Sequence, residues 1–431
     1  MTSSRDDWID ALIEAQRPGY SLDQAFYRDD AIFERDCERV LRRHWFMAGH
    51  VSEIPDSGDY RLFDVAGESI VLVRGREGAV HAHYNVCRHR GSRVLLAPTG
   101  NVASITCGYH GWSYTLDGRL RTAPRMPENF APAEYGLKPC HVKVVEGLIF
   151  VCLAEGPAPD IDAVAGHLRP LLRLHGFANA RLAHREVFPV QANWKLAIEN
   201  YLECYHCKPA HPEYCSVEIK ADSIGDGSPA AMARYDARHR EWQAQAERLG
   251  TMLPAVGTEL PLDERLPYTE FGAGYRAPLR ASHLTGTEDG RPAAPLMGEF
   301  KDYDGGETAL GIGPFTYVLA YNDHAALFEF VPHTAERSEI VTSWLVHGNA
   351  RDGEHYDRER LTWLWTVTTR QDKSIIEANA AGIRSSRYER GPSSLLERDL
   401  VGFREWYLAV VGPPSRIARL TRHGGGRYFG M

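Results

Sequence analysis

The sequence predicts an α+β protein in which a small all-β domain precedes a larger domain of mixed strands and helices. Short alternating or β-branched runs, divided by Gly and Pro, fill residues 43–155, which is the pattern of an all-β domain. Strand-like runs return over 315–346, and a long segment with helical spacing of apolar residues follows them. A length of 431 residues is also long for a single domain.

Composition narrows the class of protein. The formal net charge of −8 argues against a nucleic-acid surface and gives no reason to expect a polybasic membrane patch. No apolar run approaches the roughly 18 residues that a spanning helix needs, so we expect no membrane segment. The N-terminus is acidic and lacks the apolar core of a signal peptide. We therefore expect a cytoplasmic protein.

The expected elements follow in chain order. Residues 1–42 have helical texture and form an N-terminal segment. Residues 43–155 hold the strands of the all-β domain, and a Gly/Pro-rich linker over 156–160 opens the last domain, 156–431. The individual strands are expected at 60–65, 69–74, 80–86 and 148–153.

The last domain is expected to mix helices, loops and strands. Asn193 caps a helix that runs to Tyr205 without Gly or Pro. Residues 222–312 are rich in Gly, Pro, Ser and charge, and we expect loops and short elements around a site there. Strands over 315–346 and a long helix over 351–382 complete the domain.

A pair of Cys/His motifs lies in the all-β domain. Cys87 and His89 are separated by one residue, and Cys107 and His110 by two, with seventeen residues between the two pairs. In a reducing compartment such groupings favour metal over disulfides. A zinc finger pairs Cys with Cys and His with His, whereas each pair here is mixed. Mixed pairs suit a Rieske [2Fe–2S] cluster, in which two thiolates hold one iron and two imidazoles hold the other.

A second group of ligand-type side chains follows Asn193. Glu199, Glu203 and His206 have the spacing of one helix face, and prolines at 209 and 212 allow a bend that brings His211 beside His206. Burying such groups is costly unless something is bound there. A polar helix face with satisfied histidines is the alternative.

With both groups in view, the chain resembles the oxygenase α-subunits of the Rieske non-haem iron oxygenases over essentially its whole length. The segment from Glu199 to His211 is similar to the family motif E-N-…-[DE]-x-x-H-x4-H. The resemblance implies three parts: an N-terminal helical segment, 1–42, that packs on the catalytic domain, a Rieske domain, 43–155, and a catalytic mononuclear iron domain, 156–431. It further implies that the catalytic domain is of the helix-grip type, an antiparallel sheet wrapped by helices.

The resemblance also assigns ligands. Cys87, His89, Cys107 and His110 hold the cluster, and His206, His211 and Asp372 hold Fe(II) as two imidazoles and one carboxylate. Glu203 stands where the family has a bridging carboxylate, commonly Asp.

Several alternatives stay open around this iron site. Glu377 is a rival third ligand, Glu203 could be a fourth ligand, and Asn200 either lines the iron or bonds the backbone. A thiolate-ligated site at Cys204 and Cys207 competes with the interpretation of ordinary half-buried cysteines.

The activity implied by the resemblance is reductive activation of dioxygen on a small-molecule substrate. A separate flavin/iron–sulfur reductase supplies electrons from NAD(P)H. Within one chain the two metal sites of the family are too far apart for fast transfer, so the resemblance implies a homotrimer in which Glu203 bridges neighbouring subunits. Two other classes of protein are the alternatives. A non-catalytic Rieske electron carrier would not need His206, His211 and Asp372, and a zinc-binding structural protein would be colourless.

The substrate class is suggested by the C-terminal segments 371–382, 391–394 and 402–407 together with Glu203. These are similar to the branch of glycine betaine, stachydrine and choline monooxygenases, which implies hydroxylation or oxidative N-demethylation of a quaternary ammonium compound. Such a cation favours an aromatic cage. The candidates are Phe315, Tyr317, Tyr321 and Phe328. A ring-hydroxylating dioxygenase or an aromatic demethylase is the alternative.

Overall fold

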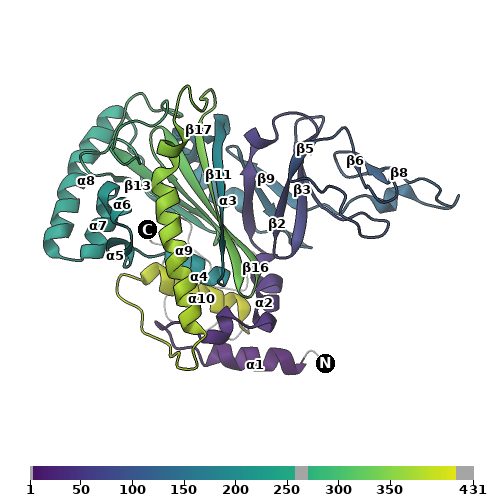
Figure 1. Ribbon diagram of the computed structural model, residues 1–431, viewed down its shortest axis with the longest axis horizontal. Helices are drawn as coiled ribbons and strands as arrows, with labels where there is room; N and C mark the ends of the chain where they lie inside the picture. The colour runs from purple at the N-terminus through teal and green to yellow at the C-terminus, as the bar shows by residue number, and fades with distance from the viewer. Residues whose placement is uncertain (1–2, 258–269, 414–431) are drawn as a thin grey trace.

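The computed structural model describes residues 3–257 and 270–413. The expected N-terminal segment and last domain thus extend into residues 1–2, 258–269 and 414–431, which lie outside the described residues. In Figure 1 a lobe of short strands projects at one end, and a larger lobe of sheet and helices forms the rest of the molecule. No helix in the described ranges is long and apolar enough to cross a lipid bilayer.

The projecting lobe contains three small antiparallel sheets, with strand orders β1-β10-β9, β4-β3-β2-β5 and β6-β7-β8. Its strands are β1 (Trp45–His50), β2 (Asp59–Val65), β3 (Glu68–Arg74), β4 (Val80–Tyr84), β5 (Thr99–Asn101), β6 (Ile105–Thr106), β7 (Ser113–Tyr114), β8 (Leu120–Thr122), β9 (His141–Val145) and β10 (Leu148–Cys152). The strands expected from alternation at 60–65, 69–74, 80–86 and 148–153 are thereby confirmed as β2, β3, β4 and β10. The linker over 156–160 contains no helix or strand.

The larger lobe is built on a seven-stranded antiparallel sheet of order β11-β17-β16-β15-β14-β13-β12. Its strands are β11 (Ala180–Val190), β12 (Val256–Gly257), β13 (Gly272–Pro278), β14 (Gly306–Ile312), β15 (Thr316–Ala320), β16 (His324–Thr334) and β17 (Arg337–His347). The expected strands over 315–346 are therefore confirmed as β15, β16 and β17.

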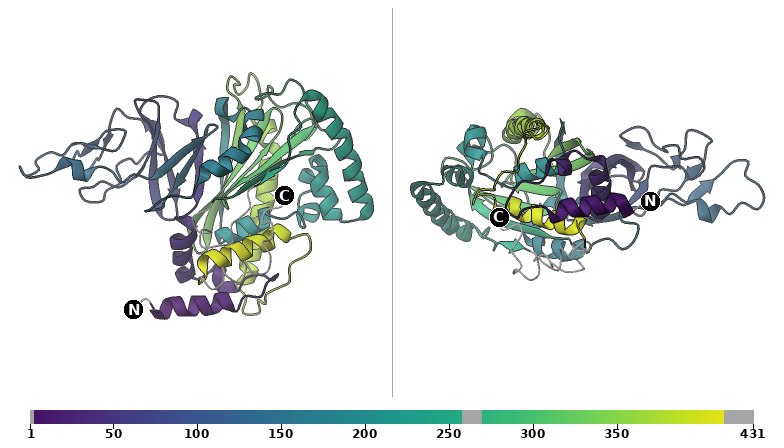
Figure 2. Two further views of the ribbon diagram at one scale, coloured as in Figure 1. Left: turned by 180° about the vertical axis from the view of Figure 1, so that it is seen from behind. Right: turned by 90° about the horizontal axis from the view of Figure 1, so that it is seen from below.

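Helices lie on both faces of this sheet (Figures 1 and 2). The α-helices are α1 (Ser3–Glu14), α2 (Asp30–Asp36), α3 (Ile161–Leu174), α4 (Trp194–Tyr201), α5 (Cys207–Ala210), α6 (Pro212–Val217), α7 (Ile219–Asp226), α8 (Pro229–Leu249), α9 (Arg358–Ile383) and α10 (Arg398–Val411). The short helical turns are η1 (Gln24–Tyr27), η2 (Cys37–Leu41), η3 (Val51–Glu53), η4 (Pro132–Tyr135) and η5 (Phe177–Asn179).

The period-two alternation of strand side chains divides the core in two. On β15, Tyr317 and Leu319 pack into the core shared with α4, α9 and α10. Their neighbours Val318 and Ala320 pack into the core shared with α3 and β10. The sheet is therefore buried on both faces, which makes it a rigid support for the site on the α4 and α9 side.

The N-terminal helices contact α4 and α10. The Tyr27 hydroxyl donates to Glu199 Oε1 on α4 at 3.0 Å, and the Tyr407 hydroxyl on α10 donates to Asp36 Oδ1 at 2.7 Å. Asp36 also forms a fully buried ion pair with Lys195. These contacts anchor η1 and α2 against the helices that support the site.

Two of the expected elements are wrong in extent. Residues 222–312 contain the 21-residue helix α8 as well as β13 and β14, where only loops and short elements were expected. Only Ala231, Trp242 and Ala246 of α8 are buried, so the helix has too few apolar positions to show periodicity. The last long helix begins at Arg358 behind the capping side chain of Asp357, and not at residue 351.

Candidate metal centres

The two Cys/His motifs occupy a matched pair of loops. In the first, Cys87 N donates to Ser92 O and Gly91 N donates to Cys87 O; in the second, Cys107 N donates to Trp112 O and Gly111 N donates to Cys107 O. Gly91 and Gly111 have φ of 75° and 73°, a left-handed conformation that favours glycine. The repeat explains why one chain can present two similar ligand pairs to a shared group.

Side-chain positions in these loops fit a binuclear cluster. Cys87 and Cys107 are buried, whereas His89 and His110 are exposed, with their Nδ1 atoms 3.1 Å apart. Two Nδ1 lone pairs at that separation can meet one iron, while the thiolates serve the other. The donor set therefore fits a Rieske cluster and not a zinc finger.

Two aromatic side chains support the loops. Trp112 stacks on His89, with ring centroids 5.0 Å apart and planes inclined by 7°. Tyr114 Oη lies 3.3 Å from Cys87 Sγ and accepts from Arg88 N at 3.1 Å. A hydroxyl that donates to a cluster thiolate raises the reduction potential of the cluster. Tyr114 was not predicted from the sequence, because no local pattern marks a strand residue four positions after His110.

The second group departs from the expected single helix. Asn193 caps α4 by accepting from Lys195 N at 3.0 Å, as predicted, but α4 ends at Tyr201. The Glu203 carboxylate accepts from the backbone N–H groups of Tyr205 and His206, which competes with helix continuation. Consequently Glu199, Glu203 and His206 do not share one helix face.

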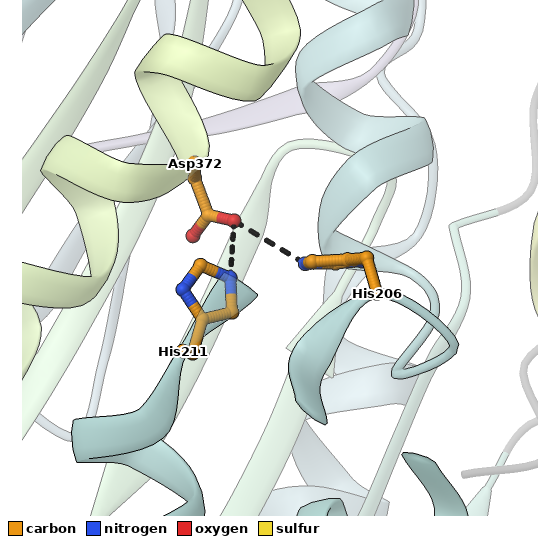
Figure 3. Close-up of side chains that lie close together, drawn as sticks. All are labelled: His206, His211 and Asp372. Carbon is orange, nitrogen blue, oxygen red and sulfur yellow. Dashed lines mark hydrogen bonds and ion pairs between the residues drawn. The ribbon is translucent and has the colours of Figure 1, made fainter. Parts of the chain in front are cut away.

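The three expected iron ligands nevertheless come together (Figure 3). Asp372 Oδ1, from α9, lies 2.9 Å from His211 Nε2 and 3.3 Å from His206 Nε2. One ligand atom from each of the three residues lies within 4.8 Å of the others. Two imidazoles and a carboxylate in this arrangement fit a non-haem Fe(II) site with open positions.

Neighbouring groups orient both imidazoles. His206 Nδ1 donates to Glu203 Oε1 at 2.6 Å, and His211 Nδ1 donates to Gln371 Oε1 at 2.8 Å. Gln371 is held in turn by its own donation to Glu213 Oε2 at 2.8 Å. With Nδ1 protonated, each Nε2 keeps its lone pair for a metal. Gln371 directly precedes Asp372 in the sequence, and its role emerges only from the fold.

The electrostatics of this site favour a cation. Burial lowers the pKa of His206, but hydrogen bonds with Asp372 and Glu203 outweigh burial and raise that pKa to about 10. Burial raises the pKa of Asp372, but its hydrogen bonds with His206 and His211 bring it below the ordinary value. Positive charge between the carboxylates is therefore stabilised, as a ferrous ion requires.

The competing residues lie in other environments. Glu377 accepts from Gln191 N at 2.9 Å and pairs with Lys373, away from the three ligands. Glu199 is buried and pairs with Arg404 at 2.7 Å. Asn200 Nδ2 lies 3.4 Å from His206 Nε2, which places it beside the three ligands. Cys207 and Cys215 pack with Ala221 in a small apolar cluster that Cys204 contacts, which fits ordinary half-buried cysteines.

Both lobes of the chain match known protein families. Residues 44–145 match the Rieske [2Fe-2S] domain, and residues 177–412 match the ring hydroxylating alpha subunit (catalytic domain). This chain belongs to the Rieske non-haem iron oxygenase α-subunits. The family's cofactors are a [2Fe–2S] cluster and a mononuclear iron, and its oxygenase subunits work with a separate reductase on a small-molecule substrate.

Named relatives of this Rieske oxygenase cover nearly the whole chain. It is 35% identical to the glycine betaine monooxygenase oxygenase subunit of Pseudomonas aeruginosa (strain UCBPP-PA14), over 92% of this chain and 90% of the relative. It is 36% identical to the subunit of the same name from Chromohalobacter salexigens, over 94% and 91% of the two chains. A crystal structure of the quaternary ammonium Rieske monooxygenase CntA with L-carnitine has the same fold, with a TM-score of 0.66, 21% identity, and 93% and 98% of the two chains covered.

Proposed function

We propose that this Rieske oxygenase is the oxygenase component of a monooxygenase that hydroxylates or oxidatively demethylates an N-methyl group of a quaternary ammonium compound. The observation that carries the proposal is the similarity to glycine betaine monooxygenase oxygenase subunits along more than nine-tenths of the chain. Carnitine monooxygenase oxygenase subunits, such as that of Escherichia coli (strain K12), are also 36% identical, over 46% of this chain and 54% of the relative.

The proposal assigns the metal ligands residue by residue. Cys87, Cys107, His89 and His110 hold the cluster, and the three side chains of Figure 3 hold the iron. Support comes from the paired loops, the facing Nδ1 atoms and the shared approach of both Nε2 atoms to Asp372 Oδ1. The boundaries 1–42, 43–155 and 156–431 are part of the same proposal.

The bound groups supply electrons and reductive activation of dioxygen, and the chain supplies the geometry. Glu203 and Gln371 keep the Nδ1 protons in place and fix the planes of the two imidazoles. His211 is 1% exposed, so its edge of the site is shielded from water. Tyr214 and Trp365, whose ring centroids are 5.3 Å apart, extend the shielding from His211 toward the sheet.

Glu203 has a second proposed task, which is to bridge to the exposed Rieske imidazoles of another copy of this chain in a homotrimer. Its carboxylate already holds His206 Nδ1 and is 12% exposed. Strand β6, which leads into the second Cys/His loop, lies toward the outer end of the projecting lobe, and α4, α5 and α9 lie in the other lobe (Figure 1). Contact between neighbouring subunits would therefore shorten the path for electrons.

A cytoplasmic location belongs to the proposal as well. All eight cysteines are free, which suits a reducing compartment where NAD(P)H is available.

Aromatic-ring hydroxylation is the second candidate. Part of the chain is 31% identical to the biphenyl 2,3-dioxygenase subunit alpha of Rhodococcus jostii (strain RHA1), over 48% of this chain. The candidate rests on a shorter match, and the experiment below separates the two.

The test is formaldehyde release by the purified holoprotein with a generic Rieske reductase and NADH. Glycine betaine, carnitine, choline and stachydrine form the panel, and naphthalene and biphenyl are the aromatic arm. We expect formaldehyde or an N-hydroxymethyl product from at least one ammonium compound and no diol from the arenes. Ring diols with no product from any ammonium compound would replace the proposal with the second candidate.

A further inference from the structure

Two buried glutamates have no role in the iron chemistry described above. Glu218 follows α6 directly, seven residues after His211, and Glu307 lies in β14. They are 1% and 3% exposed. The two carboxyl groups are within hydrogen-bonding reach of one another. Tyr321 donates to Glu218 Oε1 at 3.2 Å.

These carboxyls have no cationic partner among the described residues. Arg276, the buried arginine on the neighbouring strand, is committed to Asp304 at 2.8 Å. The Lys220 ammonium lies over the Tyr275 ring, 3.9 Å from its centroid. Within the described part of the chain no donor reaches Oε2 of either glutamate. Negative charge buried without compensation is strongly unfavourable, so the pair holds a proton unless a cation lies beside it.

The pKa shifts of the two carboxyl groups agree with their burial and with their lack of a cationic partner. Burial first, and then the charge of Glu307, raises the pKa of Glu218 well above its ordinary range. Burial likewise raises the pKa of Glu307, against the opposing influence of its hydrogen bond with Glu218 and of the charges of Lys220 and Arg276. A permanent cation beside the pair would reverse that tendency and let the carboxyls ionise.

Aromatic rings connect the pair to the iron site. Both carboxyls lie near enough to Tyr214 and Tyr321 for their charges to raise the pKa of each phenol, after burial itself. Tyr214 contacts the ring of His211 at a centroid separation of 6.5 Å, and a series of rings continues from Tyr214 at separations of 4.4 to 5.5 Å. Its members are Tyr214, Trp365, Phe328, Tyr201 and Tyr317. The Tyr317 hydroxyl is also buried without a described partner.

We propose that Glu218 and Glu307, with these rings, form the counter-charge that selects a quaternary ammonium head group for the iron site. The inference rests on the proposed function and names the residues that decide its specificity. A quaternary nitrogen has no N–H to donate, so it is recognised by aromatic faces and by uncompensated negative charge. Three of the cage residues expected from the sequence, Tyr317, Tyr321 and Phe328, belong to this region. Phe315 does not, because it stacks on Phe46 at 4.2 Å in the core.

The experiment compares the binding of ammonium compounds with that of an isostere whose head group has the same shape but no positive charge. Isothermal titration calorimetry of the anaerobic holoprotein measures binding of glycine betaine and carnitine, and of 3,3-dimethylbutanoate, in which carbon replaces the betaine nitrogen. We expect the wild-type protein to bind at least one of the two ammonium compounds about tenfold or more tighter than the isostere. This comparison needs no variant, so it cannot be lost to misfolding.

The variants Glu218→Gln and Glu307→Gln keep side-chain size and remove charge. Each is expected to weaken binding of the ammonium compound about tenfold while leaving the isostere unchanged. Glu241→Gln, on the exposed face of α8, removes the same charge away from the pair and is the matched control. Visible absorption of the cluster and far-UV circular dichroism check that each variant is folded.

The outcomes separate the inference from the proposed function. Loss of cation preference in both variants, with Glu241→Gln behaving as wild type, supports the inference. Retained preference in both variants overturns it, even if formaldehyde release shows that the proposed function holds. Equal wild-type binding of cation and isostere also overturns it. If neither ammonium compound binds and no formaldehyde is released, the inference and the proposed function fail together.

Discussion

The two candidate metal regions differ in how they meet solvent. In the projecting lobe the thiols of Cys87 and Cys107 are buried but both imidazoles, His89 and His110, are exposed. In the larger lobe His211 is 1% exposed and lies beneath helices and aromatic rings. An exposed imidazole edge suits electron exchange with another protein surface. A shielded ligand set suits chemistry that must be kept from bulk water.

The two regions also differ in which ring nitrogen of their histidines faces the metal. Nδ1 is the nearer nitrogen to the backbone, and His89 and His110 sit on tight loops that bring their Nδ1 atoms together. His206 and His211 instead point Nε2 inward, because Glu203 and Gln371 occupy Nδ1. In one region the backbone therefore orients the ligands, and in the other the neighbouring side chains do so.

The largest effect is expected when one metal ligand is removed from each region, which tests whether the two sites are separate. His206→Ala should lower product formation at least about a thousandfold, since the open iron face is lost, while the visible absorption of the cluster persists. His89→Ala should bleach that absorption and keep the mononuclear iron. Optical spectra, iron content and formaldehyde assays measure both. Bleaching in His206→Ala would mean that the sites are not separate.

A smaller effect, on electron delivery, is expected at Glu203, the residue proposed to bridge the Rieske cluster and the iron site. Glu203→Gln keeps an acceptor for His206 Nδ1 but removes the negative charge and one acceptor oxygen used by the backbone. We expect both metals to stay bound and single-turnover electron delivery to slow by about 10–100-fold. Glu377→Gln, a nearby loss of charge outside the ligand set, is the matched control. Unchanged single-turnover rates in Glu203→Gln would contradict the bridge.

These contrasts also show what could be predicted from the sequence. The mixed Cys/His pairs and the segment from His206 to His211 were recognisable because their ligands are close in sequence. Asp372 lies more than 160 positions from both histidines, and a family resemblance identified it, not spacing. The antiparallel strands were visible because alternation reflects a local property, the opposite direction of successive side chains.

What the sequence could not reveal depends on tertiary contact. Glu199 and Glu203 look equivalent by helical phase, and only the end of α4 at Tyr201 separates their roles. Tyr114 and Cys87 are 27 positions apart in the sequence and approach each other only in the fold. Glu218 and Glu307 are 89 positions apart in the sequence and come together only in the fold, and neither stands in a motif. Helix α8 was missed because most of its length is solvent-facing.

The last predicted effect is on stability and not on activity. It lies at the seam between the two lobes, where Arg61 on β2 and Glu53 on η3 meet Arg185 on β11 and Glu329 on β16. Arg185 donates to Glu53 Oε1 at 3.0 Å and lies 4.0 Å from Glu329 Oε1. Burial raises the pKa of Glu329 from 4.5 to about 7, against the opposing influence of Arg185 and Arg61. The seam therefore holds a carboxyl that binds its proton more tightly in the folded protein than in the unfolded chain.

The sign of the pH dependence follows from that difference. Stability from the protonated Glu329 is fully present below about pH 4.5 and is lost as pH rises through about 7. The loss amounts to at most about 3 kcal/mol. Glu329→Gln removes this titration, so its melting temperature relative to wild type should rise by several degrees between pH 5 and pH 8. The cluster absorption and the iron content should not change. A difference in melting temperature that stays constant across this range would show that Glu329 is ionised throughout, and that the seam is a fully charged network of two arginines and two glutamates.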